Sequence, residues 1–294
     1  MSKIVLTGAT GLLGGRTVVL LKDRHELHAI VRKVPSEPVK DVTYHVRDLS
    51  HEWTTDGLPN EVDAVIHLAQ STCHRDFPKR AMEQFSVNVD ATARLLDYAQ
   101  ESGARSFILA STGGIYGAHA EVITETTPEA ISDGLLRYYF DSKRCAEILV
   151  QSYSSFMNVV VLRPFFIYGP GQKSNMLVPR LIKNIRSKCA IKLNGESGAS
   201  MNPVYVDDAV KVLEESLRLE GSHTLNVGGP EVVTIRDMAT MIAQLLDVDP
   251  EFEIESGKPD GFVADISRMR SLVGNDLTDF QTGIALVINQ EMKQ

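Results

Sequence analysis

The stretch "KIVLTGATGLLGG" (residues 3–15) joins a short apolar run to a helical pattern through three glycines. The run "KIVLT" predicts a buried strand, and "LLGGRTVVLLKD" predicts the helix that follows it. Gly8, Gly11 and Gly14 are spaced GxxGxxG, which has one residue more in the first interval than the dinucleotide fingerprint. One such glycine permits the tight turn, one lets the backbone approach a pyrophosphate, and one lets the helix pack on the strand. In this strand–turn–helix setting the stretch predicts a dinucleotide site, with a purely structural turn as the alternative.

The remainder of the first half continues the alternation of strands and helices. Five further apolar runs predict strands, at residues 26–32, 42–49, 64–69, 106–112 and 158–164. Helical patterns lie between the later ones, at about residues 78–102 and 138–156. Strands that alternate with helices indicate βαβ units and a parallel sheet covered on both faces. The sequence therefore predicts an α/β fold of the Rossmann type, with a doubly wound parallel sheet.

The pattern changes after about Gly171. Helical segments are predicted at residues 178–188, 207–219 and 234–246, and short strands at 223–227 and 252–255. We expect residues 1–170 to form the dinucleotide-binding domain and residues 171–294 to form a smaller α/β region that binds the substrate. No Pro/Gly/Ser linker marks the boundary, so it is soft and segments of the two parts can interleave.

Composition excludes several classes of protein. The 294 residues carry a formal charge of 30 − 38 = −8, which argues against a nucleic-acid partner. No apolar run approaches the roughly 20 residues of a membrane span, and no charged-then-apolar leader opens the chain, so we expect a cytoplasmic protein without a membrane partner. Cys73, Cys145 and Cys189 are scattered and lack metal-ligand spacing, which predicts free buried thiols and no metal site.

The end of the second strand bears on the choice of dinucleotide. A carboxylate there would bind the ribose 2′-hydroxyl of NAD, and a guanidinium would accept the 2′-phosphate of NADP. The sequence reads "AIVRK", with Arg32 and Lys33 and no acid, so NADP is favoured over NAD. A solvated strand end is the alternative for Arg32. Asp48 and Leu49 are candidates to bracket the adenine, although Asp48 could equally cap the next turn.

A tyrosine and a lysine four residues apart stand in "RYYFDSKRCAE". Tyr139 and Lys143 share a helix face at this spacing. A tyrosine with a pKa of about 10 is a poor base, but a nearby ammonium and an oxidised nicotinamide would favour the phenolate. Tyr139 could then take a proton from a hydroxyl or give one to a carbonyl. Alone, such a pair is most often a coincidence on a helix surface. The surrounding sequence therefore decides whether Tyr139 and Lys143 are interpreted as a proton-transfer pair.

That context resembles the extended short-chain dehydrogenase/reductase family, in the branch that modifies nucleotide-sugars and includes UDP-galactose 4-epimerase and NDP-sugar reductases. The resemblance covers nearly the whole chain. It rests on seven motifs in order: "TGATGLLG", "VIHLA", "SVNVDAT", "LASTGGIYG", Tyr139-xxx-Lys143, "LRPFFIYGPGQ" and "VYVDDAV". The resemblance implies a nucleotide-sugar as the small-molecule partner and a homodimer formed through the helices near residues 78–102 and 138–156.

The resemblance also implies the site. A catalytic triad is expected, in which Thr112 fixes the carbonyl oxygen beside Tyr139 and Lys143. Leu68, Ala69 and Gln70 would line the cofactor cleft, and Asn88 would help to order its helix. The full set expected to bind the cofactor is Gly8, Thr10, Gly11, Leu12, Leu13, Gly14, Arg32, Asp48, Leu49, Leu68, Ala69, Gln70, Asn88, Ala110, Ser111, Tyr139, Lys143, Pro164 and Phe166. The substrate candidates are Thr112, Gly113, Asn175, Asn202 and Lys258.

Departures from the family pattern reduce the number of candidate reactions. The 4,6-dehydratases carry an Asp-Glu pair after the Ser/Thr, where this chain has Gly113 and Gly114, so dehydration is disfavoured. Epimerases usually show an asparagine where this chain has Phe166, and an arginine where it has Met201. These departures favour reduction of an NDP-4-keto-6-deoxysugar. An NDP-sugar 4-epimerase with retained NAD is the alternative, and a catalytically silent NAD(P) sensor is the alternative of another class.

Overall fold

The computed structural model describes residues 1–117, 121–130, 134–257 and 261–292. The chain divides into two compact units. The first unit comprises Met1–Gly117, Glu129–Pro164 and Val210–Leu225. The second unit comprises Ala118–Pro128, Phe165–Ala209 and Asn226–Gln294. The chain passes between the units several times, so each unit is built from segments that are distant in sequence.

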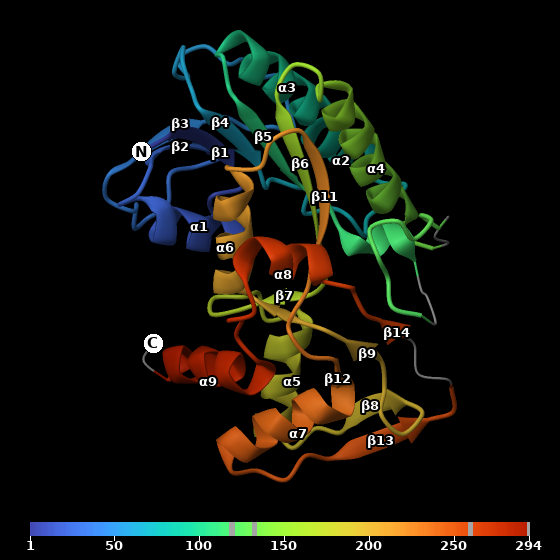
Figure 1. The fold of residues 1–294 in the computed structure, drawn as a ribbon. Helices are drawn as coiled ribbons and strands as arrows, with labels where there is room; N and C mark the ends of the chain where they lie inside the picture. Colours follow the sequence, from blue (N-terminus) through green and yellow to red (C-terminus); the bar gives the residue numbers. More distant parts are fainter. Residues whose placement is uncertain (118–120, 131–133, 258–260, 293–294) are drawn as a thin grey trace. The chain divides into compact units, whose positions relative to one another are not determined.

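The first unit is built on a seven-stranded parallel sheet, as predicted. Its strands are β1 (Lys3–Thr7), β2 (Glu26–Val31), β3 (Val42–Val46), β4 (Ala64–His67), β5 (Ser106–Ala110), β6 (Asn158–Pro164) and β11 (Ser222–Val227). They lie in the order β11-β6-β5-β4-β1-β2-β3 (Figure 1). Strand β1 pairs with β2 on one side and β4 on the other, so the strand order reverses there. In doubly wound sheets, ligands bind outside the carboxyl ends of the strands at this point.

The helices of the first unit separate into two layers. They are α1 (Leu12–Leu21), α2 (Ala81–Phe85), the π-helical turn η1 (Ser86–Asp90), α3 (Ala91–Glu101), the short 3-10 turn η2 (Gly113–Tyr116), α4 (Arg137–Ser152) and part of α6 (Val206–Ser216). The connection from β1 to β2 contains α1, and the connections from β4 to β5 and from β5 to β6 contain α3 and α4. These two sets of right-handed crossovers run in opposite directions across the sheet, so α1 lies on one face and α3 and α4 lie on the other (Figure 1). The predicted helix at 78–102 is therefore three consecutive segments, with a π turn in the middle.

Both faces of the sheet are buried. Val5, Val65 and Phe107 belong to the cluster that packs against α3 and α4, and each is 0% exposed. Their sequence neighbours Ile4 and Ile66 point to the opposite face and are equally buried. Burying such a side chain contributes about 1.5–3 kcal/mol. Because both faces are covered, the strands are continuous apolar runs, which is why the sequence pattern detected them.

The second unit contains short strands in small sheets. The strand pairs are β7 (Ile167–Tyr168) with β10 (Val204–Tyr205), β9 (Ser200–Met201) with β12 (Val233–Thr234) and β14 (Gly261–Phe262), and β8 (Ile191–Asn194) with β13 (Phe252–Glu255). Its helices are α5 (Leu177–Arg186), α7 (Ile235–Leu246), α8 (Ser267–Val273) and α9 (Phe280–Glu291). The sequence pattern predicted α5, α7 and β13. It missed the two-residue strands, because they are too short to show a period, and it also missed β8, α8 and α9.

Strand β11 and helix α7 show how tertiary and local signals differ. The segment at 223–227 was predicted with the C-terminal region, but β11 extends the main sheet beside β6. Helix α7 begins with a capping box, in which Asp237 N donates to Thr234 Oγ1 and Thr234 N donates to Asp237 Oδ2.

Among the helices of the described ranges, none is both long and apolar enough to cross a membrane.

Candidate active site

The glycine turn lies between β1 and α1, at the point where the strand order reverses. Gly8 has φ +76°, and a Cβ placed on it would lie 2.7 Å from the carbonyl carbon of Leu68, just after β4. A Cβ on Gly14 would lie 2.1 Å from the oxygen of Gly8. Only glycine therefore permits both the turn and the packing of α1 on it. The turn leaves bare backbone next to the end of β4.

This turn fits a dinucleotide. Helix α1 begins after Gly11, and no side chain of the described residues caps that N-terminus. The first N–H groups of a helix have no partner within the helix, so they are available to an anion such as a pyrophosphate. Leu12 and Leu13 open the helix, and Thr10 and Gly11 are exposed. Arg32 and Lys33, directly after β2, are also exposed.

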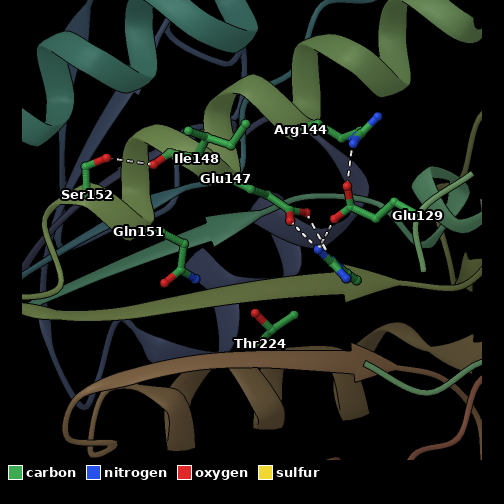
Figure 2. Close-up of a pocket in the computed structure, with 8 residues that line it drawn as sticks. Glu129, Arg144, Glu147, Ile148, Gln151, Ser152 and Thr224 are labelled. Atoms are coloured by element: carbon green, nitrogen blue, oxygen red, sulfur yellow. Dashed lines mark hydrogen bonds and ion pairs between the residues drawn. The ribbon is translucent and has the colours of Figure 1, made fainter. Parts of the chain in front are cut away.

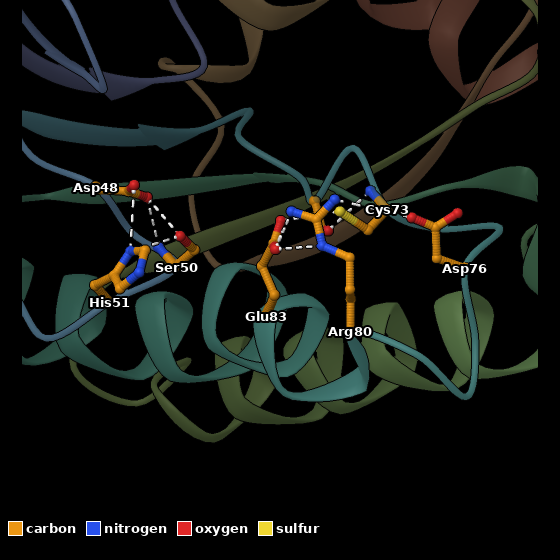
Figure 3. A network of polar contacts seen from close by, with 8 residues as sticks. Asp48, Ser50, His51, Cys73, Asp76, Arg80 and Glu83 are labelled. Atoms are coloured by element: carbon orange, nitrogen blue, oxygen red, sulfur yellow. Dashed lines mark hydrogen bonds and ion pairs between the residues drawn. The ribbon is translucent and has the colours of Figure 1, made fainter.

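Asp48 and Leu49 follow β3 and have different surroundings. Asp48 Oδ1 accepts hydrogen bonds from Ser50 N at 3.0 Å and Ser50 Oγ at 2.7 Å, and Oδ2 lies 3.3 Å from His51 Nδ1 (Figure 3). The Ser50 hydrogen bonds hold the pKa of Asp48 below its usual value. Asp48 therefore caps this turn, one of the two roles that the sequence left open. Leu49 is 6% exposed and packs in the core cluster against α3.

Tyr139 lies in the first turn of α4 and is only 9% exposed. Its Oη donates a 2.7 Å hydrogen bond to Oε1 of Gln70, on the loop after β4. Burial raises the pKa of Tyr139 well above its ordinary value, and a hydrogen bond with the Thr112 hydroxyl acts in the opposite direction. The structure therefore brings Tyr139 and Thr112 together and holds the phenol protonated.

Lys143 is buried one turn further along α4. Its Nζ donates a 2.8 Å hydrogen bond to the carbonyl oxygen of Ala110, the last residue of β5, and the residue is 2% exposed. Burial lowers the pKa of Lys143 to about 8, against the opposing charge of Glu147. Because Ala110 is two residues before Thr112, the hydroxyl, phenol and amine gather at the carboxyl end of β5.

His67 ends β4 beside this group. It is fully buried, and its Nδ1 lies 2.7 Å from Thr7 Oγ1. Burial, followed by the charge of Lys143, lowers the pKa of His67 to about 3. The imidazole is therefore neutral, as a core histidine should be. Its Nε2 and the Oγ of Ser111 are buried and have no hydrogen-bond partner among the described residues.

Asn88 lies in the π turn η1 and connects two parts of the site. Its Oδ1 accepts from Ser71 N at 3.0 Å, and its Nδ2 donates to Ser142 Oγ at 2.8 Å. Ser142 Oγ in turn donates to the carbonyl oxygen of Tyr139. The expectation was that Asn88 orders its own helix. Its amide instead joins the loop after β4 to α4, and π turns are frequent at functional sites.

Thr112 and the two glycines after it shape the end of β5. Thr112 Oγ1 accepts from Gly114 N at 3.1 Å and caps the short turn η2. Gly113 is buried. A Cβ on Gly114 would lie 2.2 Å from the ring of Phe140. A residue with a side chain at position 114 would therefore require the Phe140 ring on α4 to shift.

Two residues on the loop after β4 were missed as neighbours of Tyr139. Gln70 was expected to face the cofactor, and its contact with the phenol was not foreseen. The ring of His74 lies 5.5 Å from that of Tyr139, and its Nδ1 is buried without a partner among the described residues. The available signal was the run of polar residues directly after a buried strand, at the carboxyl edge of the sheet.

The remaining predicted residues lie at or after the end of β6. Pro164 is the last residue of β6. In the second unit, Phe166 is exposed and its ring meets Phe262 edge to face at 5.7 Å. Asn175 is exposed before α5. Asn202 is 3% exposed, and its amide bonds Ala264 N and Ala264 O at 3.0 Å each. Lys258 lies outside the described residues.

A charged pocket of about 510 Å³ adjoins the later turns of α4 (Figure 2). Arg163 in β6 is 7% exposed there, and its Nη2 contacts Glu147 Oε2 at 2.5 Å and Glu129 Oε1 at 2.7 Å. Its Nη1 donates to Tyr116 Oη at 2.7 Å. Burial alone would lower the pKa of Arg163, but the hydrogen bonds and charge of Glu147 outweigh it and raise that pKa. The buried charge of Arg163 beside this pocket is therefore paired with two carboxylates.

The cysteines are free, but only one is buried. Cys73 donates to Glu83 Oε1 at 2.9 Å, and Glu83 also pairs with Arg80 (Figure 3). Cys145 and Cys189 are exposed, so the prediction that all three are buried was wrong. Within the described residues, no group of three or more His, Cys, Asp and Glu side chains could hold a metal ion.

Comparison with known proteins shows the family to which the chain is similar. Residues 4–228 match the model of the NAD dependent epimerase/dehydratase family. The chain is 28% identical, over 93% of its length and 92% of the relative's, to the uncharacterized UDP-glucose epimerase YtcB of Bacillus subtilis (strain 168). It is 24% identical, over 93% and 92%, to the GDP-6-deoxy-D-talose 4-dehydrogenase of Aggregatibacter actinomycetemcomitans. The structure of MoeE5 in complex with UDP-glucuronic acid and NAD matches with a TM-score of 0.85 and 26% identity, over 99% of both chains.

Proposed function

The chain belongs to the NAD-dependent epimerase/dehydratase family, whose members are enzymes of the short-chain dehydrogenase/reductase class, and from this premise we propose that it reduces the 4-keto group of a nucleotide-linked 6-deoxysugar. The observation that carries this proposal is the state of Tyr139. Its phenol is buried, donates a hydrogen bond to Gln70 Oε1, and lies beside Thr112 and Lys143, which is the arrangement of a positioned proton donor. A protonated phenol is ready to give a proton, which is what reduction of a carbonyl requires.

Each residue of the triad has a task in this reduction. When bound, a reduced nicotinamide supplies the hydride. The Thr112 hydroxyl donates a hydrogen bond to the ketone oxygen, and Tyr139 Oη gives that oxygen its proton as the alcohol forms. The Lys143 ammonium stabilises the phenolate left behind. Its pKa of about 8 keeps most of the amine charged at neutral pH. Solvent then returns a proton to Tyr139.

A nucleotide-sugar substrate is supported by the relatives. MoeE5 has been solved with a UDP-sugar and NAD, and the two curated relatives have names that include a nucleotide-sugar. Gly113, Asn175, Asn202 and Lys258 remain candidates for contacts with it. Of these, Asn202 has its amide engaged by backbone and is better suited to holding the second unit together.

The cofactor preference is a separate part of the proposal. Arg32 and Lys33 are exposed after β2, and a guanidinium there suits a 2′-phosphate, which favours NADP. The MoeE5 complex contains NAD. Affinity for both dinucleotides therefore has to be measured on this chain.

Dehydration is disfavoured by packing as well as by residue type. An acid in place of Gly114 would put its Cβ 2.2 Å from the Phe140 ring. The Phe140 ring, next to Tyr139 on α4, would have to shift to accommodate it. The present packing of Phe140 on Gly114 therefore does not favour the carboxylate pair that the resemblance assigns to 4,6-dehydratases.

A second candidate is 4-epimerisation of a nucleotide-sugar with retained NAD. The observation in its favour is the similarity to a relative named as an epimerase and to a structure that contains UDP-glucuronic acid with NAD. The same three residues would then take the proton of the 4-hydroxyl and give it back to the oxygen of the 4-keto intermediate, while the retained cofactor would supply hydride to the opposite face of C4. A silent dinucleotide-binding module is the third reading, and the buried Tyr139–Lys143 pair argues against it.

The deciding experiment incubates purified protein with UDP-4-keto-6-deoxy-D-glucose and reduced cofactor, and separately with UDP-glucose or UDP-glucuronic acid and NAD. Consumption of NADPH or NADH in proportion to the ketone supports the reductase. Formation of the 4-epimer by NMR, without net cofactor consumption, supports the epimerase instead. Cofactor binding without turnover on any of these sugars would leave the silent module as the better description.

The family resemblance further suggests a homodimer through α3 and α4, together with α2. Ile148 on α4 is 65% exposed, and Met82 and Phe85 on α2 are 71% and 41% exposed. Apolar side chains exposed on neighbouring helices are typical of an interface. Light scattering of the protein and of an Ile148→Glu variant measures this, since a dimer through α4 should dissociate in the variant.

A further inference from the structure

Gln70 occupies an unusual position beside the candidate proton donor. It follows β4 by three residues, yet its amide reaches Tyr139, which is 69 residues further along the chain. The oxygen Oε1 accepts the only proton of the phenol at 2.7 Å. Gln70 is exposed, whereas Tyr139 is 9% exposed, so the amide lies on the solvent side of the phenol. The phenol must therefore break its hydrogen bond to Gln70 before it gives its proton to a substrate.

Proton transfer reverses what Tyr139 needs from its neighbour. The neutral phenol needs an acceptor, and Gln70 Oε1 supplies it. The phenolate formed after transfer needs a donor, and a carbonyl oxygen facing it would be repulsive. A glutamine amide carries both an acceptor oxygen and a donor NH₂ group, and its terminal torsion has two broad minima. Half a turn about that torsion would therefore present Nε2 to the phenolate.

We propose that Gln70 is a positioning residue for proton transfer, whose amide accepts from the Tyr139 phenol before transfer and donates to the phenolate afterwards. The inference rests on the proposed function only in taking Tyr139 as the proton-transfer group. It adds a fourth side chain to Thr112, Tyr139 and Lys143.

The other groups near Tyr139 do not take this role. Thr112 approaches from the end of β5 and also holds Gly114 N, and Lys143 is bonded to Ala110 O. His74, on the same loop as Gln70, approaches with its ring. The Nδ1 of His67 lies against Thr7 Oγ1. The Gln70 substitutions leave the chemical identity of these groups unaltered, so they test the contribution of the amide.

Two substitutions separate the two halves of the proposal. Gln70→Glu keeps an acceptor of the same length but cannot donate to a phenolate. Gln70→Leu can neither accept nor donate. The matched controls are Gln100→Glu and Gln100→Leu, at an exposed position of α3. Unchanged unfolding midpoints and circular dichroism spectra would show that all four variants remain folded.

The first measurement needs no substrate. Tyrosine is labelled at Cζ with ¹³C, the Tyr139 resonance is identified by its absence in Tyr139→Phe, and spectra are recorded with NAD across a pH series. Gln70→Leu should move the Tyr139 resonance, and Gln70→Glu should raise the pKa of the phenol by about one unit or more, because a carboxylate opposes the phenolate. The Gln100 variants should match the parent protein.

The second measurement is the pH dependence of turnover with UDP-4-keto-6-deoxy-D-glucose. We expect kcat to fall about tenfold in Gln70→Leu and further in Gln70→Glu, whose alkaline limb should move up together with the NMR titration. If Tyr139→Phe is inactive while both Gln70 variants keep the parent resonance and pH profile, the inference on Gln70 is wrong and the proposed function stands. If Tyr139→Phe retains turnover, the proposed function fails. In that case, a Tyr139 resonance that Gln70→Leu does not move would contradict the inference on Gln70 as well.

Discussion

Helix α4 carries two buried polar clusters that differ in how their charges are treated. The cluster of Tyr139 and Lys143 places titratable groups out of water with few charged partners, and burial pushes the pKa of each toward its neutral form. The cluster of Glu147 and Arg163 pairs its charges, and the pKa of Arg163 is raised. Glu147 lies between them, because it also acts on Lys143.

The contrast supports the proposal that the cluster of Tyr139 and Lys143 serves chemistry. A buried charge that is fully paired has little reason to change state, so it can hold strands and helices together but cannot exchange protons. Groups whose pKa values are displaced by burial are poised to respond to a ligand that brings new charge. The first cluster also lies at the carboxyl ends of β4 and β5, next to the switch point. Three substitutions test this division, from the largest expected effect to the smallest, and a fourth tests an exposed charge outside both clusters.

Tyr139→Phe removes the phenolic oxygen and leaves the ring. Because a positioned acid contributes about 10²–10⁴ in rate, we expect kcat to fall by about 10³, with NAD(P) affinity unchanged. Stopped-flow or steady-state measurement of cofactor oxidation gives kcat, and titration calorimetry gives the affinity. Tyr138→Phe, one position earlier on α4, is the matched control and should keep its activity. Undiminished kcat in Tyr139→Phe would mean that the first cluster is not catalytic.

Arg163→Met breaks the paired cluster. The carboxylates of Glu147 and Glu129 would lose their shared partner, and removal of one member of a buried pair costs about 3–5 kcal/mol. Urea unfolding followed by circular dichroism measures this loss. Arg144→Met is the control, because Arg144 is 35% exposed and its bond to Glu129 should contribute less than about 1 kcal/mol. Equal losses in the two variants would contradict the division.

Lys143→Met should abolish turnover yet stabilise the fold. Burial lowers the Lys143 pKa to about 8, so the folded state carries a penalty for the charged amine below that pH. As pH rises from about 8 towards the unfolded value of 10.5, the unfolded state holds more protons and the parent protein gains stability. We expect the variant to be more stable by about 1–2 kcal/mol at pH 7, after the loss of the bond to Ala110.

The pH dependence distinguishes this effect from simple packing. The advantage of Lys143→Met should shrink between pH 8 and 10, because the parent amine then becomes neutral in the folded state. Denaturant titrations at several pH values measure the difference in free energy of unfolding. Lys79→Met, at an exposed loop position, should show no such trend. An advantage that is constant with pH would mean that Lys143 is not charged when buried.

Arg32→Ser tests an exposed charge that belongs to neither cluster. If Arg32 contacts a 2′-phosphate, affinity for NADP should fall only about tenfold, because ion pairs at the surface are weak. Affinity for NAD should not change, because NAD has no 2′-phosphate. Fluorescence titration with both cofactors measures the ratio. Lys33→Ser should have a smaller effect, since Lys33 is one residue further from the end of β2. Equal losses for both cofactors would show that position 32 acts on the fold rather than on the phosphate.

Most of the first unit could be predicted, because its signals are local. The strand 3–7, the glycine turn and the helix face shared by Tyr139 and Lys143 follow from spacing alone. The second unit was predicted less well, since two-residue strands such as β9 and β12 exist only through their partners. The exposed Cys145 and Cys189 were misjudged for a related reason, because exposure of a small apolar residue is decided by packing.

The sequence by itself determined the order of strands and long helices from β1 to β6, the turn at Gly8 and the i,i+4 pair on α4, since each depends on residues within one or two turns of chain. Only the tertiary structure decided that Gln70 faces Tyr139 across 69 residues, and that Asn88 reaches Ser142 across 54. Contacts between distant segments leave no local pattern. The protonation states of Lys143 and His67 likewise depend on burial, and burial arises only when the segments pack.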